Sequence, residues 1–490
     1  MTDPRPSKGQ SSPARSATTP GADPAASGPT RANAPRSAPP SAARSALPSA
    51  ARPATPRPLT ALEERVVEEV HAARDELVAL VAELVAYDTT ARGVGEPPRD
   101  EAKLQRRLAA RLEALGGEVD LWEPEPTRAG SRLVPAGLDF AGRPQLAAVL
   151  RGRGGGPSLL LNGHIDAVSA EPREQWSSDP FVVSERDGLL YGRGVNDMKG
   201  GIACLVVALE ALSRCGVRPL GDVVFCTNTD EESSGAGGLA CVEHGVRADA
   251  GICAEPTAFD AWIACRGMVN PTITIPGRPA HAEIPQPHWR QGGGVNPVEK
   301  LPLVLAAMQE LREEWRTRPD HQHPCLAPGD IVPTIVHAGE WSVTYPAALV
   351  MQCDVQFLPG GERDDEGITV EREVRAKIDA AAAADDWLAE HPLQWTWESC
   401  TLPAEIPADH PLAQAALQAG ADVGRPGKPS GLDSWHDAAT FTQAGTPTFS
   451  YGPGGFDSAH AIDERVAVAE LVDYCAAAAL LTMRFCGVAG

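Results

Sequence analysis

The chain has 490 residues, of which 43% are apolar and 22% are charged, and its formal net charge is −22. This composition is typical of a soluble globular protein, and the length favours more than one domain. The strong negative charge argues against nucleic acids and anionic membranes as partners, and no apolar run reaches the roughly 18 residues of a transmembrane helix.

Residues 1–58 differ from the rest of the chain in composition. They contain 13 prolines, carry an excess of six positive charges, and lack Trp, Tyr, Phe, Ile, Val and Cys. Such a segment cannot bury enough apolar surface to offset the entropy that folding costs. The sequence therefore predicts a disordered Pro/Ala/Ser-rich tail that has no apolar core of a secretory signal.

The eleven cysteines all lie between Cys204 and Cys486. Their number is odd, no CxxC spacing occurs, and several stand inside apolar stretches. These features predict reduced thiols rather than disulfides or a cysteine metal site, and a cytoplasmic location is the corresponding expectation.

Helices and strands are predicted to alternate from residue 59 onwards. Amphipathic helices come first, over 59–87 and 101–117, because apolar residues recur there at helical spacing. Short apolar strands follow over 118–122, 145–152, 158–163, 222–228 and 250–254, with helices over 200–216 and 235–245. This alternation predicts an α/β fold with a mixed, mainly parallel sheet and helices on both faces.

A different pattern begins near residue 267. A strand, a helix, two strands, a helix and a last strand are predicted over 268–277, 297–315, 331–339, 347–360, 368–384 and 393–399. That order is the β-α-β-β-α-β order of a ferredoxin-like α+β unit. We therefore expect a lid or dimerisation domain at residues 267–387, inserted into a catalytic domain formed by residues 59–266 and 388–490.

Histidines and carboxylates follow several of the predicted strands or precede a helix. They are His164, Asp166, Asp197, Asp230, Glu231, Glu232, Glu255 and His460. Each alone has a structural explanation; Asp197, for example, could cap the helix that follows it. Ligands of α/β proteins bind beyond the carboxyl ends of strands, however, so these side chains are expected to meet. Clustered acids need positive charge between them, and imidazole with carboxylate but no thiolate suits zinc, with cobalt or manganese as substitutes.

Six short motifs resemble those of one co-catalytic zinc family. They are NGHIDAV (162–168), YGRGVNDMKGG (191–201), TDEESSG (229–235), CAEPT (253–257), GRPAHA (277–282) and YGPGGFDSAHAIDE (451–464). The family includes acetylornithine deacetylase, succinyl-diaminopimelate desuccinylase, aminoacylase and glutamate carboxypeptidase, and the resemblance runs from about residue 75 to the C-terminus. It implies a zinc exopeptidase-like catalytic domain, a lid domain, two metal ions and a homodimer.

The resemblance also implies roles for individual residues. Asp197 would bridge two metal ions, one held with His164 and Glu255 and the other with Glu232 and His460. Asp166 would orient His164, since a carboxylate beside a ligand fixes the imidazole tautomer. Two further roles are implied: Glu231 as the general base, and the lid histidine His281 as a donor to the oxyanion, often supplied by the partner subunit.

The substrate is less defined by the sequence. Gln356, in CDVQFLPGG, stands where many members of the family carry an arginine that binds a substrate carboxylate. A compensating cation could come from Arg266, Arg278, Arg290 or Lys428. Glutamate at position 255 is similar to the deacylases of the family rather than to its di- and tripeptidases.

We therefore expect a di-metal amidohydrolase that removes an acyl group from a small molecule, as acetylornithine deacetylase does. Gln356 and Arg266 are the candidate substrate contacts. The alternatives are a metal-dependent dipeptidase or carboxypeptidase, and a deformylase whose substrate has no α-carboxylate. An inactive binding protein is disfavoured because every ligand position and the base position are filled.

Overall fold

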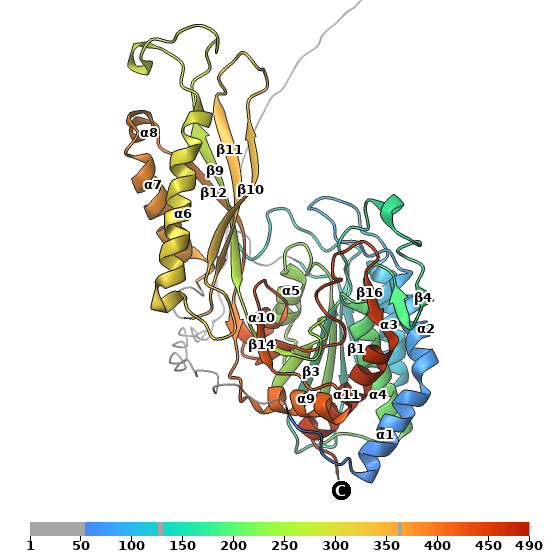
Figure 1. Ribbon diagram of the computed structural model, residues 1–490. Helices are drawn as coiled ribbons and strands as arrows, with labels where there is room; N and C mark the ends of the chain where they lie inside the picture. Colours follow the sequence, from blue (N-terminus) through green and yellow to red (C-terminus); the bar gives the residue numbers. More distant parts are fainter. Residues whose placement is uncertain (1–53, 126–130, 361–364, 490) are drawn as a thin grey trace, which may run out of the picture. The chain divides into compact units, whose positions relative to one another are not determined.

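The computed structural model describes residues 54–125, 131–360 and 365–489 (Figure 1). The predicted tail therefore lies almost entirely outside the described residues. Within the part that is described, Arg57 forms an ion pair with Asp422, with 3.3 Å between Nε and Oδ2. No helix among the described residues is long and apolar enough to cross a bilayer.

The larger sheet has nine strands in the order β1-β2-β6-β3-β7-β15-β8-β13, with β14 paired to β8. The strands are β1 (Glu118–Trp122), β2 (Gln145–Leu150), β3 (Leu159–His164), β6 (Val223–Asn228), β7 (Ala250–Cys253), β8 (Ala261–Cys265), β13 (Ala404–Glu405), β14 (Pro429–Leu432) and β15 (Thr448–Ser450). Its centre, β6-β3-β7-β15, is parallel, whereas β1, β2 and β13 pair antiparallel at the sides. The predicted mixed sheet is thus confirmed.

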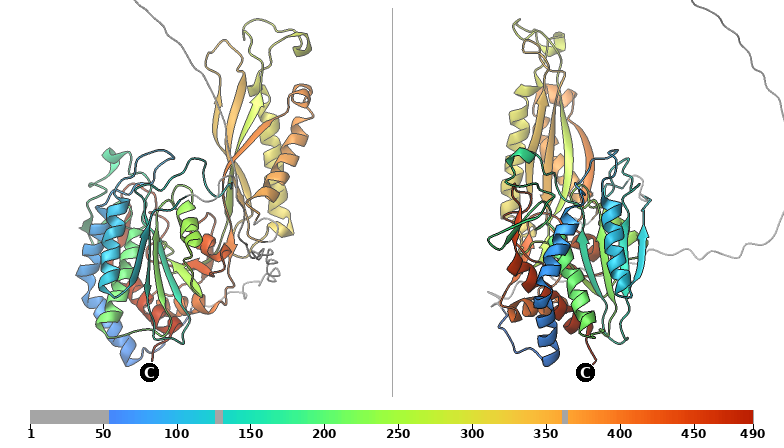
Figure 2. Two further views of the ribbon diagram at one scale, coloured as in Figure 1. Left: turned by 180° about the vertical axis from the view of Figure 1, so that it is seen from behind. Right: turned by 90° about the vertical axis from the view of Figure 1, so that its right-hand side faces the viewer.

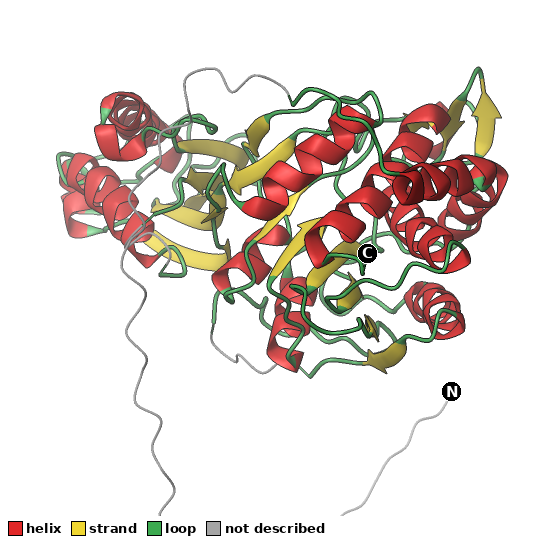
Figure 3. Cartoon of the chain, turned by 90° about the horizontal axis from the view of Figure 1, so that it is seen from below, coloured by secondary structure: helices red, strands yellow, loops and turns green. Residues whose placement is uncertain are grey.

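Helices cover both faces of this sheet, as the view from below shows (Figure 3). One layer packs around α4 and the other consists of shorter helices. The first contains α1 (Ala61–Ala72), α2 (Arg74–Val85), α3 (Glu101–Ala114), α4 (Lys199–Arg214), α9 (Pro411–Asp422) and α11 (Val468–Cys486), and the second α5 (Ala236–His244) and α10 (Ala438–Gln443). Because the centre of the sheet is covered on both faces, β3, β6 and β7 are buried along their whole length, which explains their continuous apolar sequences.

The first helix begins at a capping box. The Thr60 hydroxyl accepts from the Glu63 N–H, and the Glu63 carboxylate accepts from the Thr60 N–H at 2.8 Å. The single helix predicted over 59–87 was wrong in one respect, because the structure divides it into α1 and α2 at Ala73.

The smaller sheet has the order β10-β11-β9-β12 and is antiparallel throughout. Its elements are β9 (Gly267–Pro276), α6 (Leu301–Thr317), β10 (Asp330–Ala338), β11 (Ala348–Phe357), α7 (Ile368–Ala382), α8 (Asp386–Glu390) and β12 (Gln394–Thr401). Helices α6 and α7 lie along one face (Figures 1 and 2) and bury the alternate apolar residues of β11. The predicted β-α-β-β-α-β order is confirmed, and the sheet extends to Thr401, beyond residue 387.

A third sheet, β16-β5-β4, is small and leads into the site. Its strands are β4 (Ser184–Arg186), β5 (Leu189–Tyr191) and β16 (Arg465–Ala467). Strand β5 is followed by the loop that carries Asp197, and β16 follows the loop that carries His460. The pairing of β16 with β5 therefore joins two loops that are distant in sequence.

Candidate metal centre

Four neighbouring parallel strands end at one edge of the larger sheet. His164 is the last residue of β3, Glu231 and Glu232 follow β6, Glu255 follows β7, and the chain beyond β15 leads to His460. Since adjacent parallel strands have their carboxyl ends at the same edge, these side chains converge although their positions in the sequence are far apart.

Asp197 joins this group from the start of α4. A Cβ at Gly201, in the first turn of α4, would lie 2.2 Å from the carbonyl oxygen of Ala254. Only glycine permits so close an approach, and Ala254 immediately precedes Glu255. Gly201 thus brings the start of α4, and with it Asp197 two residues before that helix, next to the end of β7.

The carboxylate of Asp197 lies between two imidazoles. Its Oδ1 is 3.1 Å from Nε2 of His164, and its Oδ2 is 3.4 Å from Nε2 of His460. Each imidazole also lies near a second carboxylate: Glu255 Oε1 is 3.8 Å from His164 Nε2, and Glu232 Oε2 is 3.1 Å from His460 Nε2. The geometry thus offers two neighbouring sets of N and O donors that share one carboxylate.

Burial and mutual contacts shift the pKa values of the side chains in the cluster. Burial raises the pKa of Glu231 and of Glu255 well above the usual range of a glutamate. Burial alone would lower the pKa of His164. The contacts with Asp197, Glu231 and Glu255 outweigh burial and raise this pKa well above its ordinary value. Hydrogen bonds to Asp197 and then Glu232 raise the pKa of His460 to about 10. Protons are thus attracted to the place where divalent ions would neutralise the carboxylates.

Two further observations fit metal ions. His164, Asp197 and Glu232 each offer one ligand atom, and these atoms all lie within 4.8 Å of one another. Glu232 Oε1 is buried and has no hydrogen-bond partner among the described residues. Imidazole and carboxylate donors without thiolate suit zinc, cobalt or manganese, so the residues present fit a pair of such ions.

Asp166 connects His164 with the glutamate loop. Its carbonyl oxygen is 3.0 Å from Nδ1 of His164, and its carboxylate accepts from the N–H groups of Glu231 and Glu232 at 3.4 and 3.1 Å. A carbonyl oxygen can only accept, so Nδ1 carries a proton, and Nε2 is the ring nitrogen that would bind a metal ion. Asp166 therefore fixes both the tautomer of His164 and the place of the two glutamates.

Sequence reasoning missed Glu464, which holds the loop that ends at Asp197. Its carboxylate accepts from Arg193 Nη1 at 2.7 Å and from the N–H groups of Gly194, Asn196 and Asp197 at 2.9 to 3.0 Å. Both members of the ion pair are buried. The only signal in the sequence is an acid four residues after His460, at the end of the motif that contains that histidine.

Asp230 holds the turn that carries Glu231 and Glu232, as Glu464 holds the loop that ends at Asp197. Its carboxylate accepts from Arg143 Nη1 at 3.1 Å in a buried ion pair, and its carbonyl oxygen accepts from the N–H groups of Ser234 and Gly235. These bonds close the turn that contains Glu231 and Glu232.

The other predicted site residues lie outside the cluster. His281 is exposed, and its Nδ1 accepts from the N–H of Glu283 at 3.3 Å. Arg266 and Gln356 bind each other through a guanidinium-to-amide hydrogen bond, and Arg266 Nη2 also contacts Asp433 Oδ1 at 3.1 Å. The structure therefore brings Arg266 and Gln356 together, but neither is among the residues that line the pocket at the cluster.

That pocket measures about 210 Å³. Its lining combines the carboxylates and His460 with the side chains of Trp262, Met268, Leu432, Trp435 and Phe456. None of the described residues that line it is a lysine or an arginine. The volume is below the range typical of sites for drug-sized ligands, so the pocket suits a small substrate.

Comparison with known proteins agrees with this site. The model of peptidase family M20/M25/M40 matches residues 160–484. The N-formyl-4-amino-5-aminomethyl-2-methylpyrimidine deformylase of Halalkalibacterium halodurans is 28% identical over 85% of this chain and 95% of its own length. The succinyl-diaminopimelate desuccinylase of Leptothrix cholodnii is 31% identical over 65% of this chain and 76% of its own length.

Among solved structures, human carnosine dipeptidase 1 has a TM-score of 0.64 at 16% identity, over 88% of this chain and all of the other. That likeness shows the same fold. The family match spans well over half of the chain and contains every residue of the cluster. The chain belongs to peptidase family M20/M25/M40, and it is a metal-dependent hydrolase of amide bonds.

Proposed function

We propose that the chain uses two metal ions, zinc in the first instance, to remove a short acyl group from a small amine that has no α-carboxylate. A deformylase activity is the most specific form of this proposal. One observation carries it: no lysine or arginine is among the described residues that line the pocket, and the guanidinium of Arg266 is engaged by Gln356 and Asp433. A substrate carboxylate would have no counter-charge there. The Halalkalibacterium halodurans relative is a deformylase of an N-formylated aminomethylpyrimidine, which supports the same substrate class.

His164, Asp197, Glu232, Glu255 and His460 are the proposed metal ligands. The ions, when bound, polarise the amide carbonyl and lower the pKa of water. Glu231 accepts the proton of the attacking water on its carboxylate and delivers it to the leaving nitrogen. Its Oε2 is 4.0 Å from His164 Nε2, a distance that supports this role. The carbonyl of Asp166 holds a proton of His164 at Nδ1, so that Nε2 would be the nitrogen that binds a metal ion.

The first experiment is a substrate panel. Purified protein should release the amine from N-formyl-4-amino-5-aminomethyl-2-methylpyrimidine faster than from N-succinyl-diaminopimelate or from a dipeptide. Elemental analysis should give close to two ions per chain. Chelation should abolish turnover, and Zn, Co or Mn should restore it. Full activity in chelator would contradict the metal mechanism, and preference for the dipeptide would contradict the substrate class.

We propose further that the protein is a cytoplasmic homodimer. All eleven cysteines are free, as a reducing compartment would keep them. The edge strand β10 and the turn after it expose Ile335 (44%), Val336 (46%) and Trp341 (71%). Exposed apolar side chains along an unpaired strand edge are the kind of surface that a second copy can cover.

His281 is the proposed donor to the oxyanion, supplied when the lid closes or by a partner subunit. Replacing it with alanine should lower kcat far more than it raises KM, because the bond would form mainly in the transition state. His288, an exposed histidine of the same domain, is the matched control, and His288→Ala should leave kcat unchanged. Verified mixed dimers of Glu231→Gln and His281→Ala chains should regain activity if the donor comes from the partner. An unchanged kcat in His281→Ala would remove this residue from the mechanism.

A further inference from the structure

The lining of the pocket at the cluster contains a histidine that the mechanism does not use. Trp262, at the sheet, and Phe456, in the loop before His460, supply aromatic surface to this lining. Apart from the carboxylates and His460, the polar side chains of the lining are Ser434 and His436. Of these two, His436 is the buried one, with 3% of its surface exposed.

Neither ring nitrogen of His436 has a hydrogen-bond partner among the described residues. Burial lowers the pKa of this imidazole to about 3, so the ring is neutral, with one nitrogen that donates and one that accepts. A buried polar group without a partner is unfavourable, and such groups in native proteins are nearly always satisfied. A ligand in the pocket is the natural source of the missing partner.

A series of aromatic contacts connects His436 with His460 in the cluster. The Trp262 ring is stacked with His436 at 6.4 Å and 29°, and the Phe456 ring meets Trp262 edge to face at 5.8 Å and 76°. The Phe456 ring is also 6.4 Å from that of His460, and 48% of Phe456 is exposed. A flat ring entering past Phe456 would thus lie between aromatic surfaces and beside the reacting groups.

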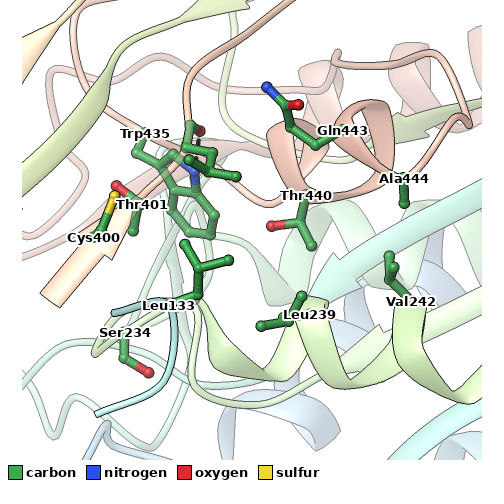
Figure 4. Close-up of a pocket in the computed structure, with 12 residues that line it drawn as sticks. Leu133, Ser234, Leu239, Val242, Cys400, Thr401, Trp435, Thr440, Gln443 and Ala444 are labelled. Atoms are coloured by element: carbon green, nitrogen blue, oxygen red, sulfur yellow. Dashed lines mark hydrogen bonds between the residues drawn. The ribbon is translucent and has the colours of Figure 1, made fainter. Parts of the chain in front are cut away.

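Two contacts hold Trp435, the residue before His436, in place. Its indole N–H donates to the carbonyl of Leu402 at 3.0 Å, and a Cβ at Gly235 would lie 2.4 Å from its ring. Trp435 also lines a second cavity, which measures about 180 Å³. Figure 4 shows Trp435 there together with Leu133 and Thr440. The contacts of Trp435 thus help to hold its neighbour His436 in place.

We propose that His436, Trp262 and Phe456 form the subsite for the amine half of the substrate, and that this half is a flat heteroaromatic ring that both donates and accepts hydrogen bonds. The aromatic side chains hold the faces of the ring, and His436 binds its polar edge. The subsite is uncharged, in keeping with the absence of lysine and arginine from the lining. This inference rests on the proposed acyl-amide hydrolysis at the neighbouring cluster.

The test compares two substrates with the same reacting group. One is N-formyl-4-amino-5-aminomethyl-2-methylpyrimidine, and the other is N-formylbenzylamine, whose ring has no polar edge. The metal-loaded wild-type enzyme should prefer the pyrimidine by at least tenfold in kcat/KM, and His436→Leu should reduce that preference at least tenfold. His436→Gln, which keeps a donor and an acceptor, should retain part of it. Trp262→Leu should lower kcat/KM for both rings relative to N-formylpropylamine.

His244 offers a matched control for the histidine. It stacks on Trp122 at 3.8 Å, far from the cluster in the fold, and binds Asp120 at 2.8 Å. His244→Phe should leave both the rate and the substrate ratio unchanged. Melting temperature and metal content of each variant separate a loss of folding from a loss of recognition.

A second measurement needs no variant. The free amine 4-amino-5-aminomethyl-2-methylpyrimidine should inhibit the wild-type enzyme at least tenfold more tightly than benzylamine does. An unchanged substrate ratio in folded, metal-loaded His436→Leu, or equal inhibition by the two amines, overturns the subsite and leaves a water as the partner of His436. No hydrolysis of any formyl or acyl amide by the wild-type enzyme would instead overturn the proposed function itself.

Discussion

Replacing Glu231 with glutamine is expected to lower kcat by a factor of about 10²–10⁴, the range that general-base catalysis contributes. The amide keeps the shape of the side chain but cannot accept the proton of the attacking water. The proposed metal ligands are untouched, and Asp166 still holds the backbone of the loop at Glu231 and Glu232. Metal content should therefore remain near two ions per chain while turnover is lost.

The neighbouring residue provides the contrast. Glu232 Oε2 lies 3.1 Å from His460 Nε2, and Glu232 belongs to the group whose ligand atoms converge within 4.8 Å. Glu232→Gln should accordingly lose metal as well as activity, which elemental analysis of the two variants would distinguish. Near wild-type turnover by Glu231→Gln would mean that another group is the base. Loss of metal from that variant would make Glu231 a ligand.

Replacing Glu464 with alanine is the second change with a large expected effect, although this residue is not a proposed ligand. Removing it leaves the buried charge of Arg193 without its partner, which costs about 3–5 kcal/mol when a buried ion pair is broken. It also frees the N–H groups of Gly194, Asn196 and Asp197, so Asp197 is no longer held in place. Metal affinity should fall about 10–100-fold, as when other groups that orient ligands are lost.

Thermal unfolding and metal titration would check this expectation. The surface pair of Arg74 and Glu185 is the control, because its N–O distance of 2.6 Å is similar to the 2.7 Å of the buried pair. Glu185→Ala should leave the melting temperature and the metal affinity unchanged, since water and salt screen an exposed pair. Equal effects of the two replacements would show that Glu464 has no special connection to the metal centre.

The sequence predicted the cluster because of the way parallel sheets are built. His164 ends a short apolar strand, Glu231, Glu232 and Glu255 follow such strands, and the carboxyl ends of parallel strands meet at one edge. What it could not supply was the order β6-β3-β7-β15, since strand pairing depends on contacts between residues far apart in the chain. That order determines which donors become neighbours.

The features that the sequence did not reveal depend on contacts between distant parts of the chain. Glu464 binds backbone N–H groups, which every residue except proline possesses. Its partners therefore cannot be predicted from a pattern of side chains. Arg266 and Gln356 were expected to face a substrate; the structure shows that they bind each other, because Arg266 directly precedes β9 and Gln356 lies in β11, the strand paired with β9. Strand pairing of this kind cannot be read from local sequence. The division of the first helix at Ala73 likewise has no breaker residue to mark it.

The position of the smaller sheet within the chain has a consequence for synthesis on the ribosome. Residues of β9 to β12 are translated after Glu255 and before β15 and His460, so the inserted unit emerges while the sheet around it still lacks its strand between β7 and β8. The inserted unit has its own apolar core and can form first. The proposed ligands that follow β3, β6 and β7 are translated well before His460, which lies near the end of the chain. Under the proposed ligand assignment, a nascent chain interrupted before β15 would lack one histidine of the metal centre, so the second ion would bind only when nearly the whole polypeptide is available.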